Sequence, residues 1–250
     1  MKNFLTVVMV MCMAAASFGA YTSNFAAMAQ DSLLVGQDGW VGNYAYGTTT
    51  RESLQISGPW AYDGLNFNNG PYAYAGAARD VSADVVGGMY EAIFTINSQE
   101  YYNGSSFTFS IGNSGLTDTA VGNALDLVYD SRDPLLYLRR HINDTYEYET
   151  AVEFPKELDT YLVQQLKIAI DLNAGTAKLY WRDADNATGT PIGDWTYLAD
   201  WNYALPFTSV TQVGIQASNY NYIRGFESVP EPATMGLLSL GGLLLARRRK

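Results

Sequence analysis

The sequence predicts an all-β fold, an antiparallel sandwich, on three observations. Short runs of alternating or continuously apolar residues recur along the chain, separated by Asn, Gly and Asp residues that favour turns. Aromatic residues make up 14% of the chain, including 19 Tyr, and they favour strands. Between residues 20 and 230 no long segment has helical periodicity. With 48% apolar residues in 250, the chain can bury a substantial core.

The strand-like segments follow one another from the first third of the chain to its end: 53–57, 89–97, 106–112, 124–130, 135–141, 145–154, 161–172, 176–183, 209–218 and 221–226. The clearest unit is a hairpin over 164–181. Leu166, Ile168 and Ile170 share one face of its first strand, and Asn173-Ala174-Gly175 supplies the turn. The returning strand alternates in the same way, through Ala177, Leu179 and Trp181.

The charges are distributed unevenly between the ends and the body. Five of the 15 Lys and Arg residues are Lys2 and residues 247–250, which leaves ten in the body against 24 of the 25 Asp and Glu residues. The body therefore carries a net charge of about −14, which repels nucleic-acid phosphates. We expect no nucleic-acid partner.

Residues 1–20 are typical of a secretory signal peptide. Lys2 precedes an apolar run from Phe4 to Ala16, and small residues follow it. This run is shorter than the ~20 residues of a spanning helix, although a retained membrane anchor is the alternative. The only cysteine, Cys12, lies in the run, so the exported body would contain no disulfide.

The C-terminal segment, residues 229–250, has three successive parts. Pro230 and Pro232 favour an extended chain around Glu231. The uncharged run 233–246 would be about 21 Å long as a helix, so we predict a short transmembrane helix. Basic residues prefer the cytoplasmic side and can snorkel, which places the body outside the cytoplasm. The basic anchor is Arg247, Arg248, Arg249 and Lys250.

This order of V-P-E-P-A, a short Gly/Leu-rich helix and a terminal basic cluster resembles the PEP-CTERM sorting tail of exported bacterial proteins. The resemblance implies that Pro230, Glu231 and Pro232 form a recognition motif. Its partner would be an exosortase, an integral-membrane processing enzyme that releases the protein or transfers it to the cell surface or extracellular matrix. The alternative is an ordinary C-terminal anchor that happens to follow Pro-Glu-Pro.

The body, residues 21–228, resembles the concanavalin A-like, laminin G-like jelly-roll domains. The resemblance is carried by GQDGW at 36–40, by KIAIDLNAGTAKLYW at 167–181 and by a closing strand that runs directly into the tail. It implies two stacked antiparallel sheets, one of them concave and often binding carbohydrate.

Glycoside hydrolases also occur on this fold, and they need two carboxylates that flank the scissile bond. The hydrolases of this fold use Glu-x-Asp-x-x-Glu, and the nearest approach is Glu157-Leu158-Asp159, where the third acidic position is Leu162. The only histidine, His141, is expected at the surface or in a turn rather than as a base. We expect a non-catalytic protein. A polysaccharide-active hydrolase or lyase, with acids paired by distant loops, is the alternative.

One loop offers oxygen ligands of the kind that Ca²⁺ takes. Asp183, Asp185 and Asn186 lie in the Gly-containing segment 181–190. Asx-rich loops after strands also satisfy their own backbone groups, so both interpretations stay open. Zinc is disfavoured because the body has one His and no Cys.

Four Tyr-x-Tyr pairs would each show two rings on one face of a strand. Flat rings stack on sugars, so the pairs are candidates for a sugar-binding platform; packing across strands is the alternative. The expected function is that of an exported surface or matrix protein that adheres to polysaccharide. The candidate pairs are Tyr44/Tyr46, Tyr72/Tyr74, Tyr146/Tyr148 and Tyr220/Tyr222.

Overall fold

The computed structural model describes residues 23–29, 32–42, 55–56, 65–66, 74–98, 106–113, 123–130, 133–142, 145–153, 163–185, 188–218 and 221–229. Two short 3₁₀ helices occur among them, η1 (Phe25–Ala27) and η2 (Ser82–Asp84). The strands are β1 (Ser23–Asn24), β2 (Trp40–Gly42), β3 (Gln55–Ile56), β4 (Leu65–Asn66), β5 (Tyr74–Asp80), β6 (Met89–Ser98), β7 (Ser106–Gly112), β8 (Ala124–Asp130), β9 (Asp133–Ile142), β10 (Thr145–Glu153), β11 (Val163–Asp171), β12 (Thr176–Ala184), β13 (Pro191–Asp200), β14 (Gln212–Ser218) and β15 (Asn221–Val229).

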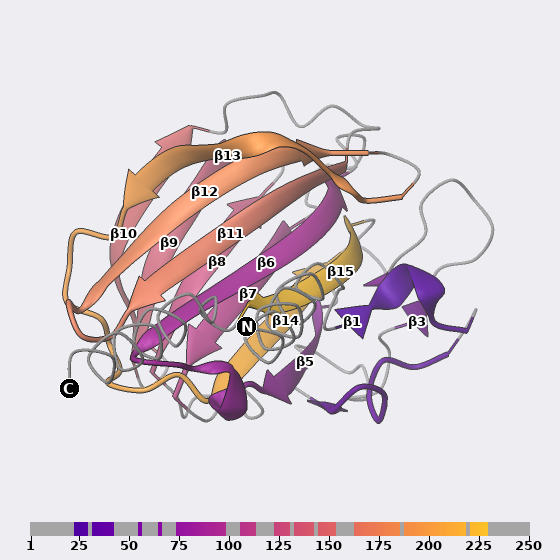
Figure 1. Ribbon diagram of the computed structural model, residues 1–250, viewed down its shortest axis with the longest axis horizontal. Helices are drawn as coiled ribbons and strands as arrows, with labels where there is room; N and C mark the ends of the chain where they lie inside the picture. The colour runs from indigo at the N-terminus through magenta and orange to yellow at the C-terminus, as the bar shows by residue number, and fades with distance from the viewer. Residues whose placement is uncertain are drawn as a thin grey trace, which may run out of the picture.

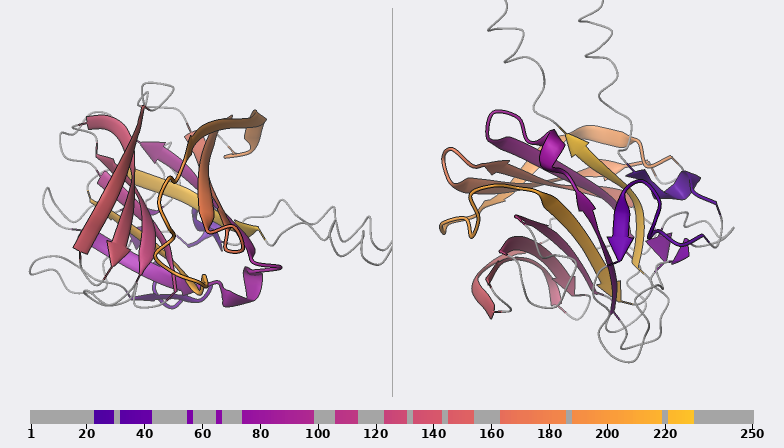
Figure 2. Two further views of the ribbon diagram at one scale, coloured as in Figure 1. Left: turned by 90° about the vertical axis from the view of Figure 1, so that its left-hand side faces the viewer. Right: turned by 90° about the horizontal axis from the view of Figure 1, so that it is seen from below.

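These strands form two antiparallel sheets that stack face to face (Figure 1 and Figure 2). The eight-stranded sheet has the order β13-β12-β11-β6-β15-β4-β3, and β1 also pairs with β15. The seven-stranded sheet has the order β10-β9-β8-β7-β14-β5-β2. The predicted all-β antiparallel sandwich is therefore confirmed.

The chain changes sheets repeatedly. β7 to β10 form a meander in the seven-stranded sheet, and β11 to β13 form one in the eight-stranded sheet. β14 then returns to lie between β7 and β5, and β15 returns to pair with β6. Strands that are far apart in the sequence thus become neighbours at the centre of each sheet.

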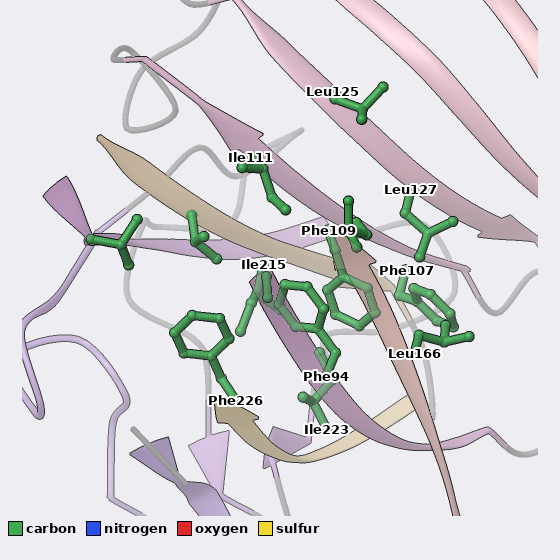
Figure 3. Packing of buried hydrophobic residues seen from close by; sticks show 14 of the residues in the cluster. Phe94, Phe107, Phe109, Ile111, Leu125, Leu127, Leu166, Ile215, Ile223 and Phe226 are labelled. Carbon is green, nitrogen blue, oxygen red and sulfur yellow. The ribbon is translucent and has the colours of Figure 1, made fainter. Parts of the chain in front are cut away.

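The core lies between the sheets and is rich in phenylalanine (Figure 3). Phe94 of β6 and Phe109 of β7 stack across the layer with ring centroids 3.9 Å apart, and Phe226 of β15 lies 5.4 Å from Phe94. All three side chains are fully buried. Burial of each contributes about 1.5–3 kcal/mol, because apolar surface leaves water. The period-two alternation of these strands produces this packing.

The predicted hairpin is confirmed as β11–β12. Its turn is held by Asp171, whose Oδ1 accepts hydrogen bonds from the N–H groups of Asn173 and Ala174, each at 2.9 Å. Gly175 closes the turn with φ of +67°, a conformation that favours glycine. The inward residues pair as the alternation requires: Leu166 with Trp181, Ile168 with Leu179 and Ile170 with Ala177.

The segment GQDGW forms a tight turn that delivers Trp40 to the core. The N–H of Gly36 donates to the carbonyl of Trp40 at 2.8 Å. The indole packs edge-on against Phe25 and Phe226, with centroids 5.7 Å away in each case. Its Nε1–H donates to the Ser23 hydroxyl at 2.9 Å, so Trp40 fastens the first described segment to the sandwich.

Two long strands have no counterpart among the predicted ones. β13 is the edge strand of its sheet and is exposed along most of its length, so it shows no apolar alternation. β5 (YAGAARD) is built from small residues that strands usually disfavour. Ala77 and Ala78 are nevertheless fully buried, because β5 is covered on both sides by β2 and β14. Pairing with neighbouring strands, which is not a local property, makes both segments strands.

Candidate functional site

One face of the seven-stranded sheet collects polar and charged side chains in its centre. Along β8, Leu125 and Leu127 point into the core, so Asp126 between them lies on the face turned away from it. The register places Ser110 of β7 on one side of Asp126 and Arg139 of β9 on the other. Tyr137 and His141, two residues before and after Arg139, share this face. We call these five residues the Asp126 face.

Asp126 is 1% exposed, although it lies on an outer face. Its Oδ2 lies 3.9 Å from Nδ1 of His141, and the Ser110 hydroxyl donates a hydrogen bond to the carboxyl group. In the described part of the chain, Oδ1 of Asp126 has no hydrogen-bond partner. Burial raises the pKa of Asp126, while the Ser110 hydrogen bond and the charges of His141 and Arg139 lower it; burial dominates. The site therefore holds an acceptor whose need for a donor is unmet.

The solvent side of this acceptor is formed by β9. Tyr137, Arg139 and His141 are each half-buried, and the guanidinium carbon of Arg139 lies 5.2 Å from the centroid of the Tyr137 ring. Hydrogen-bond donors and a flat ring thus stand beside the carboxyl of Asp126. This combination suits a ligand that presents hydroxyl groups and an apolar face together.

Glycoside hydrolysis would need a second carboxyl group close to Asp126. Ala124 and Val128 are the nearest residues to Asp126 on the same face of β8. Its cross-strand partners are Ser110 and Arg139. None of these adjacent neighbours is an acid. Hydrolases hold two carboxyl groups about 5–9.5 Å apart, and Glu149 of β10 pairs with Arg139, two strands from Asp126; its side chain lies outside the description. The segment 157–159, the nearest sequence approach to a catalytic triplet, lies outside the described residues.

The candidate calcium ligands occupy different kinds of position. Asp183 lies inside β12, paired with Ile192, and not in the predicted loop, because the hairpin with β13 extends the strand to Ala184. Asp185 begins the turn, and its Oδ1 accepts from the N–H and the hydroxyl of Thr188 at 2.8 and 2.9 Å. Asn186 lies outside the described residues. Within the described ranges there is no group of three or more His, Cys, Asp or Glu residues placed to hold a metal ion. Calcium stays a prediction.

The tyrosine platform also stays a prediction. Four of the eight tyrosines belong to strands β5, β10 and β15, but the structure does not describe their side chains: Tyr74, Tyr146, Tyr148 and Tyr222. The other four lie entirely outside the described residues: Tyr44, Tyr46, Tyr72 and Tyr220. In register, Tyr146 of β10 pairs with His141 at the border of the Asp126 face.

The terminal segments lie outside the described residues as well. These are the signal peptide, the motif Pro230, Glu231 and Pro232, the apolar run, and the basic anchor Arg247–Lys250. Among the described residues, which lie between 23 and 229 with gaps, no helix has the length and hydropathy to cross a membrane. β15 ends at Val229, so the motif follows the last strand directly.

Asp126 and His141 were missed as a pair at the level of sequence. His141 was expected at the surface or in a turn; its side chain is 20% exposed and faces the buried carboxyl, because β8 and β9 pair in register. The sequence does carry one signal, an acid flanked by leucines within an apolar strand, ALDLVYD. Alternation alone places that acid opposite the core.

Comparisons with known proteins agree with this architecture and with the tail. Residues 228–250 match the model of the PEP-CTERM protein-sorting motif, which confirms the motif predicted from Pro230, Glu231 and Pro232. A motif of this class implies an exported protein. No curated protein matches the chain.

Solved structures with the same fold include two proteins named for carbohydrates. The metal-free carbohydrate recognition domain of Emp46p is 10% identical with a TM-score of 0.52, over 86% of this chain and 97% of that one. A β-glucanase of Bacillus licheniformis is 11% identical with a TM-score of 0.52, over 84% and 97%. Likeness at this identity shows the jelly-roll-like sandwich and no activity.

Proposed function

We propose that this exported chain is a non-catalytic, carbohydrate-binding protein of the cell surface or extracellular matrix, and that it binds polysaccharide through the Asp126 face. The observation that carries the proposal is the buried carboxyl of Asp126 with the half-buried side chains of His141 and Arg139 beside it on an outer face. The carboxyl lies beneath the surface, so a ligand would contact these side chains, which the charge of Asp126 attracts. The names of the two fold neighbours agree with this ligand class.

The surrounding side chains would complete recognition. Arg139 and His141 present N–H donors for the ring and hydroxyl oxygens of a sugar, and the Tyr137 ring presents a flat apolar face. Small-ligand sites commonly consist of an apolar surface with a small number of polar groups that converge on the ligand. No acid stands directly beside Asp126 on the two flanking strands, which supports binding as the proposed activity.

The test compares the wild-type protein with Asp126→Asn on a glycan array and by calorimetry against the producer's own matrix polysaccharide. The amide keeps the shape but removes the negative charge that attracts His141 and Arg139, so affinity should fall roughly 10- to 150-fold, equivalent to about 1.5–3 kcal/mol. Asp38→Asn, an exposed acid in the turn before β2, is the matched control and should bind normally. Binding by Asp126→Asn at wild-type strength would refute the role of this face.

The same proteins separate binding from catalysis. We expect no turnover of pooled glycans by the wild type. Product formation that disappears in Asp126→Asn would establish the hydrolase or lyase alternative.

Sorting is proposed to proceed through an exosortase-type enzyme, with a signal peptide at residues 1–20 and a short transmembrane helix after the motif. Changing Glu231 to Ala, or deleting residues 247–250, should leave full-length protein in the membrane fraction. Mass spectrometry of the protein from cells reads both termini. Trimming in both variants as in the wild type would contradict this route.

A further inference from the structure

The eight-stranded sheet carries an aromatic and cationic cluster on its own outer face. It lies over β11, β12 and β13, where Lys167 pairs with Tyr180, and Tyr180 with Tyr197. Ile168, which follows Lys167, and Leu179, which precedes Tyr180, point into the core. Because side chains alternate along a strand, the cluster faces away from the core. We call Lys167, Tyr180, Arg182, Trp195 and Tyr197 the Trp195 platform.

A bulge in the edge strand brings Trp195 onto this platform. The register shifts between Trp181 and Asp183 of β12, so that residues 193–195 of β13 lie opposite the single residue Arg182. Gly193 within the bulge has φ of +76°, which favours glycine. Bulges bend a strand and re-aim its side chains, and here the indole is turned inward across β12.

Two cationic side chains lie against the Trp195 indole. The guanidinium carbon of Arg182 lies 3.9 Å from the centroid of the Trp195 ring, and Nζ of Lys167 lies 4.9 Å from it. Nε of Arg182 donates to Oε1 of Gln165 at 2.8 Å, and Nε2 of Gln165 donates to the Thr95 hydroxyl at 3.0 Å. Gln165 and Thr95 are buried, so the position of Arg182 is fixed before any ligand arrives.

The charges of the platform are balanced. Lys167 pairs with Glu91 at 3.2 Å. The pKa of Glu227 is raised, mainly by burial and to a smaller extent by the charge of Glu91. The nearby positive charge of Arg182 acts in the opposite direction. Two cations are thus matched by two carboxylates, and a body of net negative charge disfavours an acidic ligand. Tyr197, at 51% exposure, packs edge-on against Tyr180 with ring centroids 5.9 Å apart.

We infer that the Trp195 platform is a second glycan-binding site, which takes the apolar face of an uncharged pyranose ring stacked on the indole. It lies on the opposite side of the sandwich from the Asp126 face, since β11 to β13 and β8 to β9 belong to different layers (Figure 1). Two outward-facing sites make one domain a cross-linker of polysaccharide chains. The inference shares the ligand class of the proposed function but none of its residues.

The test uses a neutral polysaccharide, a soluble β-glucan, and a carboxylated one, alginate, each in affinity gels and on coated beads. The proteins are the wild type, Trp195→Ala, Trp195→Phe, Asp126→Asn and the double variant Trp195→Ala with Asp126→Asn. Tyr203→Ala, an exposed tyrosine outside the platform, is the control. Circular dichroism and the melting temperature of each variant show that it is folded.

We expect Trp195→Ala to bind the neutral glucan at least tenfold more weakly, measured as the retardation of the protein in the affinity gel, and to abolish bead clumping. The reason is that truncating a central aromatic contact costs much of the binding free energy. Trp195→Phe keeps a ring and should retain more binding, and Asp126→Asn should retain the binding that depends on Trp195. Retardation and clumping by Trp195→Ala at wild-type levels, or a preference for alginate that Trp195→Ala leaves intact, overturns the second site. Loss in Asp126→Asn alone supports the proposed function without the platform, whereas loss in Trp195→Ala alone supports the platform without the Asp126 face.

Discussion

Replacing Asp126 with Asn removes one buried ionisable group and keeps the shape of the side chain. Burial raises the pKa of Asp126 in the folded protein, against the Ser110 hydrogen bond and the charges of His141 and Arg139. The folded protein therefore holds this proton at a higher pH than the unfolded chain, whose Asp pKa is about 3.9. Protonation favours folding, so the contribution of Asp126 to the free energy of unfolding falls as the pH rises from the unfolded value through the folded one.

The structure sets the size of the effect. Ionised Asp126 carries the cost of a buried charge that its neighbours offset only in part, whereas the amide carries no charge; this cost is about 1–3 kcal/mol. At pH 7, Asp126→Asn should therefore be more stable than the wild type by about 1–3 kcal/mol. In a domain of this size each kcal/mol corresponds to about 2–4 °C in melting temperature. Below the unfolded pKa both side chains are neutral, and the difference should vanish.

Urea denaturation followed by circular dichroism from pH 3 to pH 8 measures this difference directly. The other carboxylates titrate in both proteins, so subtracting the two curves leaves the contribution of Asp126. Asp194→Asn should give a difference that is flat and close to zero, because Asp194 is exposed. A variant Asp126→Asn that is less stable than the wild type at pH 7, or a gap that does not depend on pH, would refute the reasoning.

Three further changes test how the sandwich is held together, each by urea denaturation. Trp40→Ala should lower the free energy of unfolding by about 3–5 kcal/mol, because it empties a fully buried indole site; a loss under 1 kcal/mol would contradict its anchoring role. Gly88→Ala should cost about 1–2 kcal/mol, since φ is +85° and a Cβ would lie 2.5 Å from Nδ2 of Asn173; unchanged stability would show that this turn relaxes freely. Asp171→Ala should cost about 1–2 kcal/mol, because two backbone N–H groups lose their acceptor, and Asp171→Asn should recover part of it.

Local chemistry was enough to locate the strands with one buried face. In β6, β7 and β11 every second residue enters the core, so the pattern of apolar residues is visible in the sequence. The turn at Asn173 to Gly175 was visible for a similar reason, because its geometry depends on neighbouring residues alone. β13 and β5 escaped because one is exposed as an edge and the other is filled with small residues.

The candidate sites followed a different rule. The carboxyl of Asp126 acquires its partners through the pairing of β7, β8 and β9, and nothing in ALDLVYD states which strands will flank it. The Trp195 platform needs a bulge in β13 and the side chain of Thr95 on β6, which is the strand next to β11 and lies 100 residues earlier in the chain than Trp195. Neither arrangement is a property of a short window.

The sequence alone was sufficient for the C-terminal sorting motif and for the presence of the sandwich. The tail is read as a linear motif, and alternation within a strand does not depend on its neighbours. Which strands pair, and therefore which polar side chains meet on each outer face, was decided by the packing of both sheets around one core. The same alternating strand can pair with many partners, and only the arrangement that buries all the apolar faces together selects among them.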